Sequence, residues 1–319
     1  MIFCGDSLEV LRTLPDESVQ CCVTSPPYWG LRDYGVEGQI GLEKNLSDHL
    51  EKIVSLFREV RRILRPNGVI WVNYGDVYVS PTKGRNGDGT HSEVEQKRFL
   101  QGSHKGSIQG VLPRVKYDLP LKNLIGLPWR VAFALQDDGW ILRSEIIWHK
   151  TNAMPESVKD RPGKAHEHLF LLAKNPKYYF DHEAIKERRT EASIKKNKVK
   201  SLIVHKKENI PGREGVRDYS RRGWGSDYTS ELRNSRTVWE IPTQPTKEKH
   251  FATFPDELVR RCIVASTKPG DLVIDPFLGS GTTYKVALEL GCKAIGIELN
   301  PDYIKIAEHK ISSIHPLFQ

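Results

Sequence analysis

The sequence predicts an α/β fold built on a mostly parallel sheet with helices on both faces. Apolar runs of strand type alternate with segments of helical spacing, from a strand at 19–23 through a helix at 47–64 to a strand at 69–74. The same order returns at 272–274 and 293–297, where a glycine-rich turn and a helix separate two apolar runs. Strand–helix–strand order of this kind indicates parallel strands joined by crossover helices.

The N-terminal elements are read from apolar spacing and from residues that start or stop helices. Residues 2–4 form a short strand, and Ser7 is expected to cap the helix that follows. A long helix begins at Ser47 or Asp48 and carries apolar residues at helical spacing. The turn at 65–68, which contains a proline and a glycine, is expected to end it.

The middle of the chain mixes regular and irregular segments. A helix is expected over 128–136, and strands over 140–148 and 168–174. Residues 80–118 lose the pattern because glycines are scattered among polar residues, which predicts a long loop. Residues 183–240 are irregular as well.

The C-terminal segment is the most regular. One helix begins at Phe254-Pro255, with the proline at its first position. A second helix follows the glycine-rich turn and stops at Gly291. The strand at 293–297 then ends at Glu298, and Asn300-Pro301 opens the last helix.

Composition indicates a globular chain with a basic surface. The 319 residues include 48 Lys and Arg against 40 Asp and Glu, a net charge of +8. No apolar run reaches the roughly 18–20 residues that span a membrane, and we expect no membrane association. The N-terminus has no secretory signal, and the five cysteines form no Cys-x-x-Cys pair, so we expect free thiols in a reducing cytoplasm.

The positive charge is concentrated in one segment. Residues 183–222 contain 13 Lys and Arg against 6 Asp and Glu. This excess is typical of a surface that neutralises phosphate groups, and it is also typical of a solvated loop.

The tetrapeptide Ser25-Pro26-Pro27-Tyr28, preceded by Thr24, stands where a strand gives way to a loop. The carboxyl end of such a strand is where open α/β sheets bind their ligands. A hydroxyl, carbonyls on residues without N–H groups and an aromatic ring could hold a planar group that bears an NH2. On these residues alone, a proline-rich turn with a surface aromatic is an equal alternative.

The glycine-rich turn runs from Asp275 to Thr283 and could bind a ligand at a helix N-terminus. It lacks the Gly-Lys-Ser/Thr of a phosphate-binding loop and the third glycine of a dinucleotide fingerprint. Asp275 would repel a pyrophosphate and would suit a cation, while Glu298 could accept hydrogen bonds from ribose hydroxyls. Together these features suggest S-adenosyl-L-methionine, with Thr282 and Thr283 binding its carboxylate. The alternative is a tight turn with a capping acid.

The two motifs, in this order, closely resemble those of the amino-group DNA methyltransferases of the β arrangement, and the resemblance covers most of the chain. Residues 5–7, 64–73 and 254–255 also look like motifs of that family. The resemblance implies a Rossmann-like, S-adenosylmethionine-dependent methyltransferase fold. It implies a mostly parallel sheet of the seven-stranded type, circularly permuted because the cofactor strands come last in the chain, with recognition insertions.

The resemblance also implies which residues form the site. Ser25 and the Pro26 carbonyl would accept hydrogen bonds from the amine, and Tyr28 would stack on a base flipped out of the duplex. Trp29 is expected to pack in the core. No metal is expected. The implied cofactor-binding residues are Asp6, Thr24, Phe254, Pro255, Asp275, Pro276, Phe277, Gly279, Ser280, Gly281, Thr282, Thr283, Glu298, Leu299 and Asn300; the implied catalytic residues are Ser25, Pro26, Pro27 and Tyr28.

In this family a serine at the first position of the tetrapeptide is associated with cytosine-N4 methylation, and Asp or Asn with adenine-N6. Ser25 therefore favours cytosine N4, with adenine N6 as the alternative. Two rival hypotheses are a catalytically silent relative that binds nucleic acid and an enzyme that methylates RNA or a protein glutamine. A cysteine nucleophile, as in C5-cytosine enzymes, is not expected.

The domain assignment follows from the same resemblance. Residues 1–182 and 241–319 are expected to form the catalytic domain, 183–240 the target-recognition insertion, and 80–118 a second DNA-facing loop. Double-stranded DNA is the implied partner, in a prokaryotic cytoplasm or a phage-infected host. A cognate restriction endonuclease and a homodimer stay open.

Two further clusters have less specific patterns. The run His166-Glu167-His168 lacks metalloprotease spacing, and we expect a structural role. Trp148, Lys150 and Asn152 could line the base pocket or serve in packing.

Overall fold

A computed structural model describes residues 1–79, 119–195, 231–244 and 254–312. The chain divides into two compact units, one of Met1–Phe180 with Thr237–Gln319 and the other of Asp181–Arg236. The expected loop at 80–118 and most of the basic segment lie outside the described residues.

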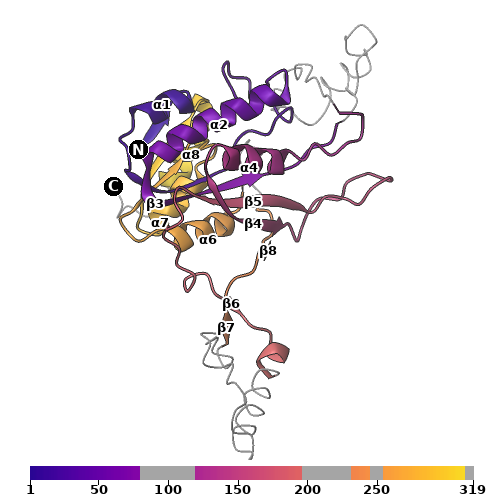
Figure 1. The fold of residues 1–319 in the computed structure, drawn as a ribbon, viewed down its shortest axis with the longest axis vertical. Helices are drawn as coiled ribbons and strands as arrows, with labels where there is room; N and C mark the ends of the chain where they lie inside the picture. The colour runs from indigo at the N-terminus through magenta and orange to yellow at the C-terminus, as the bar shows by residue number, and fades with distance from the viewer. Residues whose placement is uncertain (80–118, 196–230, 245–253, 313–319) are drawn as a thin grey trace, which may run out of the picture. The chain divides into compact units, whose positions relative to one another are not determined.

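The larger unit is built on an eight-stranded sheet with the order β1-β10-β9-β2-β3-β5-β4-β8 (Figure 1). The first five strands in this order are parallel, and β5 runs antiparallel to both its neighbours. The expected permuted, mostly parallel sheet is therefore confirmed. The strands are β1 (Ile2–Cys4), β2 (Val19–Thr24), β3 (Leu64–Tyr74), β4 (Ile141–His149), β5 (His166–Ala173), β8 (Val238–Glu240), β9 (Leu272–Asp275) and β10 (Lys293–Glu298).

The permutation joins the two ends of the sequence inside one sheet. The C-terminal strands β9 and β10 lie between the N-terminal strands β1 and β2. The ammonium group of Met1 is fixed at this junction, where it donates to the Tyr284 hydroxyl at 2.7 Å and to the Ala294 carbonyl at 2.9 Å. The two sequence motifs therefore end up on neighbouring strands although about 250 residues separate them.

Two groups of helices cover the sheet. One group packs in the order α1, α2, α4 and the other in the order α6, α7, α8. Figure 1 shows α2 and α4 on the opposite side of the strands from α6 and α7. The helices are α1 (Ser7–Thr13), α2 (Leu46–Ile63), α4 (Leu127–Asp137), α6 (Asp256–Ser266), α7 (Thr282–Glu289) and α8 (Pro301–Ser312).

The centre of the sheet is the most deeply buried part. All six residues of β2 are buried, as expected for a strand covered by helices on both faces. Trp29, which follows the tetrapeptide, is 1% exposed and donates from its indole nitrogen to the Glu43 carbonyl at 2.9 Å. Its expected packing role is confirmed.

Several boundaries differ from the sequence-based expectation. Asp6, and not Ser7, caps α1, because the Asp6 carboxylate accepts from the backbone N–H groups of Leu8 and Glu9. The expected turn at 65–68 lies inside β3, which begins as α2 ends.

Strand β8 was not predicted. Its three residues fall in a segment that the sequence suggested was irregular, and they pair in parallel with β4 at the sheet edge. Only Trp239, at 2% exposure, is buried within it. A single buried residue gives no periodicity, so long-range pairing alone defines this strand.

The smaller unit contains a two-stranded antiparallel sheet of β6 (Glu187–Arg188) and β7 (Leu232–Arg233). The carboxylate of Glu187 binds the guanidinium groups of Arg233 and Arg236 at 3.4 and 3.5 Å. In neither unit do the described helices reach the length and apolarity needed to cross a membrane.

Candidate active site

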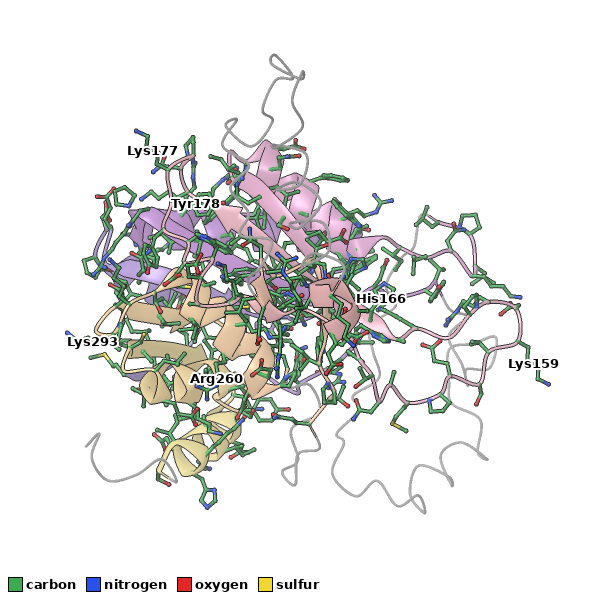
Figure 2. All side chains as sticks on the ribbon, turned by 90° about the horizontal axis from the view of Figure 1, so that it is seen from below. Lys159, His166, Lys177, Tyr178, Arg260 and Lys293 are labelled. Atoms are coloured by element: carbon green, nitrogen blue, oxygen red, sulfur yellow. The ribbon has the colours of Figure 1, made fainter. Side chains whose placement is uncertain are left out.

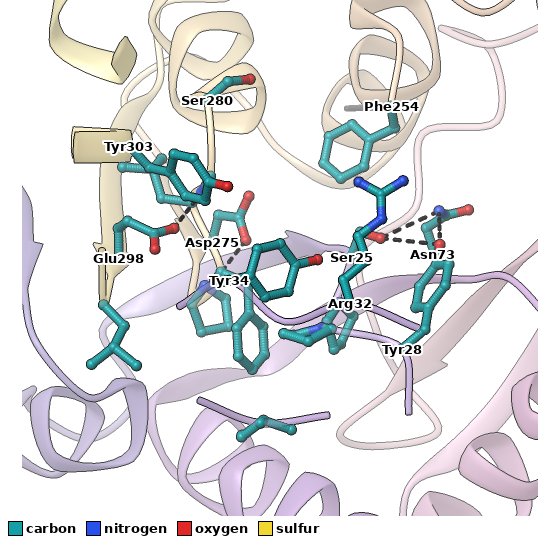
Figure 3. A pocket seen from close by; sticks show the side chains of 18 of the residues that line it. Ser25, Tyr28, Arg32, Tyr34, Asn73, Phe254, Asp275, Ser280, Glu298 and Tyr303 are labelled. Carbon is teal, nitrogen blue, oxygen red and sulfur yellow. Dashed lines mark hydrogen bonds between the residues drawn. The ribbon is translucent and has the colours of Figure 1, made fainter. Parts of the chain in front are cut away.

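A cavity of about 390 Å³ opens at the carboxyl ends of β2, β9 and β10 and brings the two motifs together. Figure 3 shows Asp275, Ser280 and Glu298 on one side of it and Ser25 and Tyr28 on the other. Expected site residues that line the cavity are Asp6, Ser25, Pro26, Pro27, Tyr28, Phe254, Asp275, Pro276, Phe277, Gly279, Ser280, Thr282, Glu298, Leu299 and Asn300.

The glycine-rich turn depends on backbone angles that favour glycine. Gly279 has φ 52° and Gly281 has φ 81°, both in the left-handed region. A Cβ at Gly281 would lie 2.9 Å from the Cβ of Ala307 on α8. The turn can therefore approach α8 closely while α7 begins at Thr282.

Asp275 is a buried acid at the end of β9. It is 1% exposed, and its Oδ1 accepts from the Thr24 hydroxyl at 2.6 Å and from the Phe277 N–H at 3.0 Å. Burial raises the pKa of Asp275 to about 6. Both of these hydrogen-bond donors are uncharged, so the site favours a ligand that carries a cation.

Glu298 occupies the matching position at the end of β10. Its two carboxylate oxygens accept from the backbone N–H groups of Gly279 and Asn300 at 2.8 and 2.9 Å. Burial raises the pKa of Glu298 above its usual value. These bonds fix the carboxylate at the cavity wall, where it can accept from ligand hydroxyls. The donor set thus fits a nucleoside that carries a cation.

Four expected cofactor residues do not line the cavity, namely Thr24, Pro255, Gly281 and Thr283. Thr283 donates its hydroxyl to the Val23 carbonyl at 3.1 Å and so ties α7 to β2. The Thr282 hydroxyl accepts from Lys310 Nζ at 2.9 Å. The Thr283 hydroxyl hydrogen is therefore used within the protein, whereas Thr282 keeps a hydrogen that it can donate to a ligand.

The sequence did not point to the loop after the tetrapeptide, yet residues 31–40 supply much of the cavity wall. Within it, Tyr34 meets Tyr303 of α8 edge to face at 6.3 Å between ring centroids. The guanidinium Nη1 of Arg32 is buried and makes no hydrogen bond within the described parts of the chain. Arg32 therefore offers a donor to a ligand in the cavity.

The tetrapeptide faces a polar cluster on β3 and β5. Asn73 Nδ2 donates to Glu167 Oε2 at 2.8 Å and to the Tyr28 hydroxyl oxygen at 3.0 Å, and lies 3.4 Å from Ser25 Oγ. The Tyr28 hydroxyl donates to Glu167 Oε2 at 3.0 Å. Ser25 Oγ lies 3.3 Å from the Tyr28 oxygen.

The protonation of Glu167 and Tyr28 determines which groups in this cluster donate hydrogen bonds and which accept them. Glu167 is buried, but the charge of Lys150 and several hydrogen bonds lower its pKa below the usual value, so the carboxylate only accepts. Burial and the Glu167 charge raise the pKa of Tyr28, which keeps its proton and directs it to Glu167. Ser25 can then donate only toward the Tyr28 oxygen, and a lone pair of Ser25 Oγ stays available.

Glu167 and Asn73 are site residues that sequence reasoning missed. Both line the cavity, and Glu167 pairs with Lys150 Nζ at 2.5 Å. The signal for Glu167 was its place in the run His166-Glu167-His168, where strand alternation turns Glu167 away from the histidines.

The residues of the two further clusters named from the sequence have different contacts. Lys150 lines the cavity and lies over the Trp148 ring at 4.5 Å. Asn152 instead binds Thr243 through its side chain. His168 Nδ1 lies 2.6 Å from Glu145 Oε1. The described residues contain no cluster of His, Cys, Asp or Glu that could hold a metal ion.

A family model described as DNA methylase, of the N6/N4 type, matches residues 19–309. The chain belongs to this family. Similar proteins include the Type II methyltransferase M.Cfr9I of Citrobacter freundii, 44% identical over 97% of this chain and 87% of that protein. M.SmaI of Serratia marcescens is 43% identical over 97% of this chain and 90% of that protein.

Solved structures share the fold. TTHA0409 of Thermus thermophilus, complexed with S-adenosyl-L-methionine, matches with a TM-score of 0.59 and 24% identity over 99% of this chain and 95% of that chain. PvuII DNA methyltransferase, which is cytosine-N4-specific, matches with a TM-score of 0.59 and 19% identity over 98% and 90%. The protein is thus a DNA methyltransferase of the amino-group class that uses S-adenosyl-L-methionine.

Proposed function

We propose that this enzyme methylates the exocyclic N4 of cytosine in double-stranded DNA. The observation that carries the proposal is the hydrogen bonding of Ser25, whose Oγ lies beside a Tyr28 hydroxyl that donates to Glu167, while Ser25 and Pro26 both line the cavity. Two acceptors at this position can take both hydrogens of an amine. Such bonds draw the nitrogen out of conjugation with the ring and leave its lone pair free to attack.

Lys150 supports cytosine over adenine. Its ammonium group uses one N–H on Glu167 and has two more donors at the cavity wall. Cytosine has a carbonyl oxygen, O2, that can accept from such a donor, and adenine has no carbonyl.

The cofactor supplies the methyl group when it is bound. We propose that Asp275 faces its cationic portion, that Glu298 accepts from its ribose hydroxyls, and that Asp6 and Leu299 contact its adenosine part. We assign the cofactor carboxylate to the buried guanidinium of Arg32, with the Thr282 hydroxyl as the alternative donor.

We further propose a Type II enzyme of the prokaryotic cytoplasm, like the relatives that carry this name, in which residues 183–240 read the target sequence. The basic excess of 183–222 supports this role because it can neutralise phosphates. The expected DNA-facing loop at 80–118 lies outside the described residues. A partner endonuclease and a homodimer would complete the system.

The deciding experiment incubates the enzyme with unmethylated plasmid DNA and S-adenosyl-L-methionine, digests the product to nucleosides and separates them by mass spectrometry. We expect N4-methylcytosine, and none with the Ser25→Ala variant. N6-methyladenine would overturn the choice of base. Absence of any methylated nucleoside, with cofactor bound, would instead favour a catalytically silent relative.

A further inference from the structure

Behind the tetrapeptide lies a buried polar chain that the reaction itself does not use. His49 of α2 is 0% exposed, Tyr74 at the end of β3 is 0% exposed, and Glu43 is 7% exposed. His49 Nδ1 lies 2.9 Å from Glu43 Oε2, and His49 Nε2 lies 2.9 Å from the Tyr74 hydroxyl. The Tyr74 hydroxyl in turn donates to the Pro27 carbonyl at 3.1 Å.

The protons of this chain can be counted. The Pro27 carbonyl only accepts, so the single proton of the Tyr74 hydroxyl is directed to it. The Tyr74 oxygen is hydrogen-bonded to His49 Nε2 as well.

The Nδ1 nitrogen of His49 is a donor. Burial raises the pKa of Glu43, but the hydrogen bond from His49 and further bonds lower it to about 2, so Glu43 is a carboxylate that only accepts. His49 Nδ1 therefore donates to Glu43 Oε2. Lys52 Nζ lies 3.1 Å from Glu43 Oε1.

The chain contacts the tetrapeptide at several points. The Tyr74 ring stacks on the Tyr28 ring at 4.9 Å between centroids and 26° between planes. The backbone of Glu43 accepts from Trp29, and its carboxylate accepts from Gly41 N–H at 2.9 Å. A Cβ at Gly41 would lie 3.3 Å from the Pro27 Cβ, so this segment packs directly against the prolines.

We propose that Glu43, His49 and Tyr74 are positioning residues that fix the orientation of the tetrapeptide. The Pro27 carbonyl shares a peptide plane with the N–H of Tyr28, and because the prolines have no N–H, a carbonyl is the backbone hydrogen-bonding group that each of them offers. Fixing that plane fixes Tyr28 and the preceding Pro26 carbonyl. The inference rests on the proposed role of Ser25-Pro26-Pro27-Tyr28 in holding the amine.

The first experiment uses the full chain with ¹⁵N-labelled histidine. We expect one imidazole whose Nδ1 is protonated at pH 7.5, assigned to His49 by its loss in the His49→Gln variant. A His49 without a proton on Nδ1 would overturn the hydrogen bond to Glu43 and with it the positioning chain. This readout does not depend on activity.

The second experiment is Tyr74→Phe, which removes the hydroxyl and keeps the ring that stacks on Tyr28. We expect kcat to fall about 10-fold to 100-fold, the loss typical of a misplaced reacting group, with unchanged affinity for the cofactor by calorimetry. The matched control is Tyr178→Phe, whose hydroxyl accepts from Arg143 at the surface, and its kcat should equal that of the wild type.

The outcomes separate this inference from the proposed function. If the Tyr74→Phe variant has the kcat of the wild type while the Ser25→Ala variant is inactive, the positioning role is wrong and the proposed function is unaffected. Wild-type kcat in Ser25→Ala would remove the proposed role of the tetrapeptide as well. A thermal melt of each variant identifies any loss of activity that comes from unfolding. If a variant unfolds, the ¹⁵N spectrum of the wild type still tests the hydrogen bond from His49 to Glu43.

Discussion

At the scale of single residues, the ionised Asp275 lowers the stability of the unliganded fold and favours binding of the cofactor. Its carboxyl is buried, accepts two hydrogen bonds and has a pKa raised by burial to about 6 from an ordinary value of 3.8. The folded protein therefore holds the proton more tightly than the unfolded chain, and ionisation costs the unliganded fold stability. That cost is absent below about pH 4 and complete above about pH 6, where it amounts to about 3 kcal/mol.

We predict that Asp275→Asn stabilises the unliganded protein at pH 7.5 and weakens cofactor binding. Asn keeps an oxygen for Thr24 and Phe277 and removes the buried charge, so the melting temperature should rise. Losing the charged partner of the cofactor should cost about 1–3 kcal/mol of binding. Thermal melts and calorimetry measure the two effects, and the exposed Asp302→Asn is the matched control.

The same residue predicts a pH dependence. In the wild type, cofactor affinity should fall as pH drops through about 6, because Asp275 takes up a proton. In Asp275→Asn the affinity should stay flat over this range. A wild-type affinity that does not change between pH 5 and pH 7.5 would contradict this role of Asp275. A parallel fall in the variant would show that another group is responsible.

Ser25 carries a prediction at the same scale. Ser25→Ala should lower methyl transfer by about 100-fold or more, since the amine loses an acceptor in the reacting geometry, while the cofactor binds as before. Transfer of a radiolabelled methyl group to DNA measures the first effect and calorimetry the second. Transfer at the wild-type rate would contradict the role assigned to Ser25.

At the scale of elements, the turn between β9 and α7 combines two constraints on one residue. Gly281 needs a left-handed backbone and also has no room for a side chain against Ala307. Gly270, in the turn before β9, has a similar φ of 87° with nothing within 4 Å of its added Cβ. Comparing the same substitution at Gly270 and Gly281 therefore distinguishes the cost of backbone strain from the cost of steric contact.

We predict that Gly270→Ala costs about 1 kcal/mol of unfolding free energy, from the backbone angle alone. Gly281→Ala should cost more, because α7 and α8 must move apart as well, and it should also weaken cofactor binding. Urea unfolding and calorimetry provide the comparison. Equal losses in the two variants would mean that contact with Ala307 adds no cost.

At the scale of the whole molecule, the permuted sheet brings both ends of the sequence to one cavity. The cofactor half comes from β9 and β10, and the acceptor half from β2, β3 and β5. The excess of positive charge lies in residues 183–222, which are apart in the sequence from the two motifs that form the cavity. DNA affinity should therefore respond to substitutions that leave the cavity unchanged.

We predict that replacing Lys198 and Lys200 by Ala weakens DNA binding and its salt dependence and leaves cofactor affinity unchanged. Each lost phosphate contact should reduce the slope of log K against log salt by about 0.9. The matched control replaces Lys177 and Lys293, which lie on the outside of the larger unit (Figure 2). An unchanged slope in the first variant would count against a DNA-binding role for these lysines.

The sequence by itself determined the α/β class, the order of most elements and the two motifs. Apolar periodicity, helix-stopping glycines and prolines, and the unusual pairing of a glycine-rich turn with a preceding acid are local features, so they can be read without a structure. Together with the family resemblance that the motifs carry, they were sufficient to infer the cofactor and to place Asp275 and Ser25 in one site. Local reading erred where neighbouring candidates compete, as when Asp6 and not Ser7 capped α1.

Tertiary structure alone decided which side chains meet the motifs. Glu167 and Asn73 reach Ser25 and Tyr28 from antiparallel strands, Arg32 turns its guanidinium to the cavity, and β8 exists only through pairing with β4. These contacts join residues far apart in the sequence, and no local spacing records which distant partner a buried polar group will find. The proton directions within the site follow from those partners, because a carboxylate or carbonyl that only accepts fixes every donor bound to it.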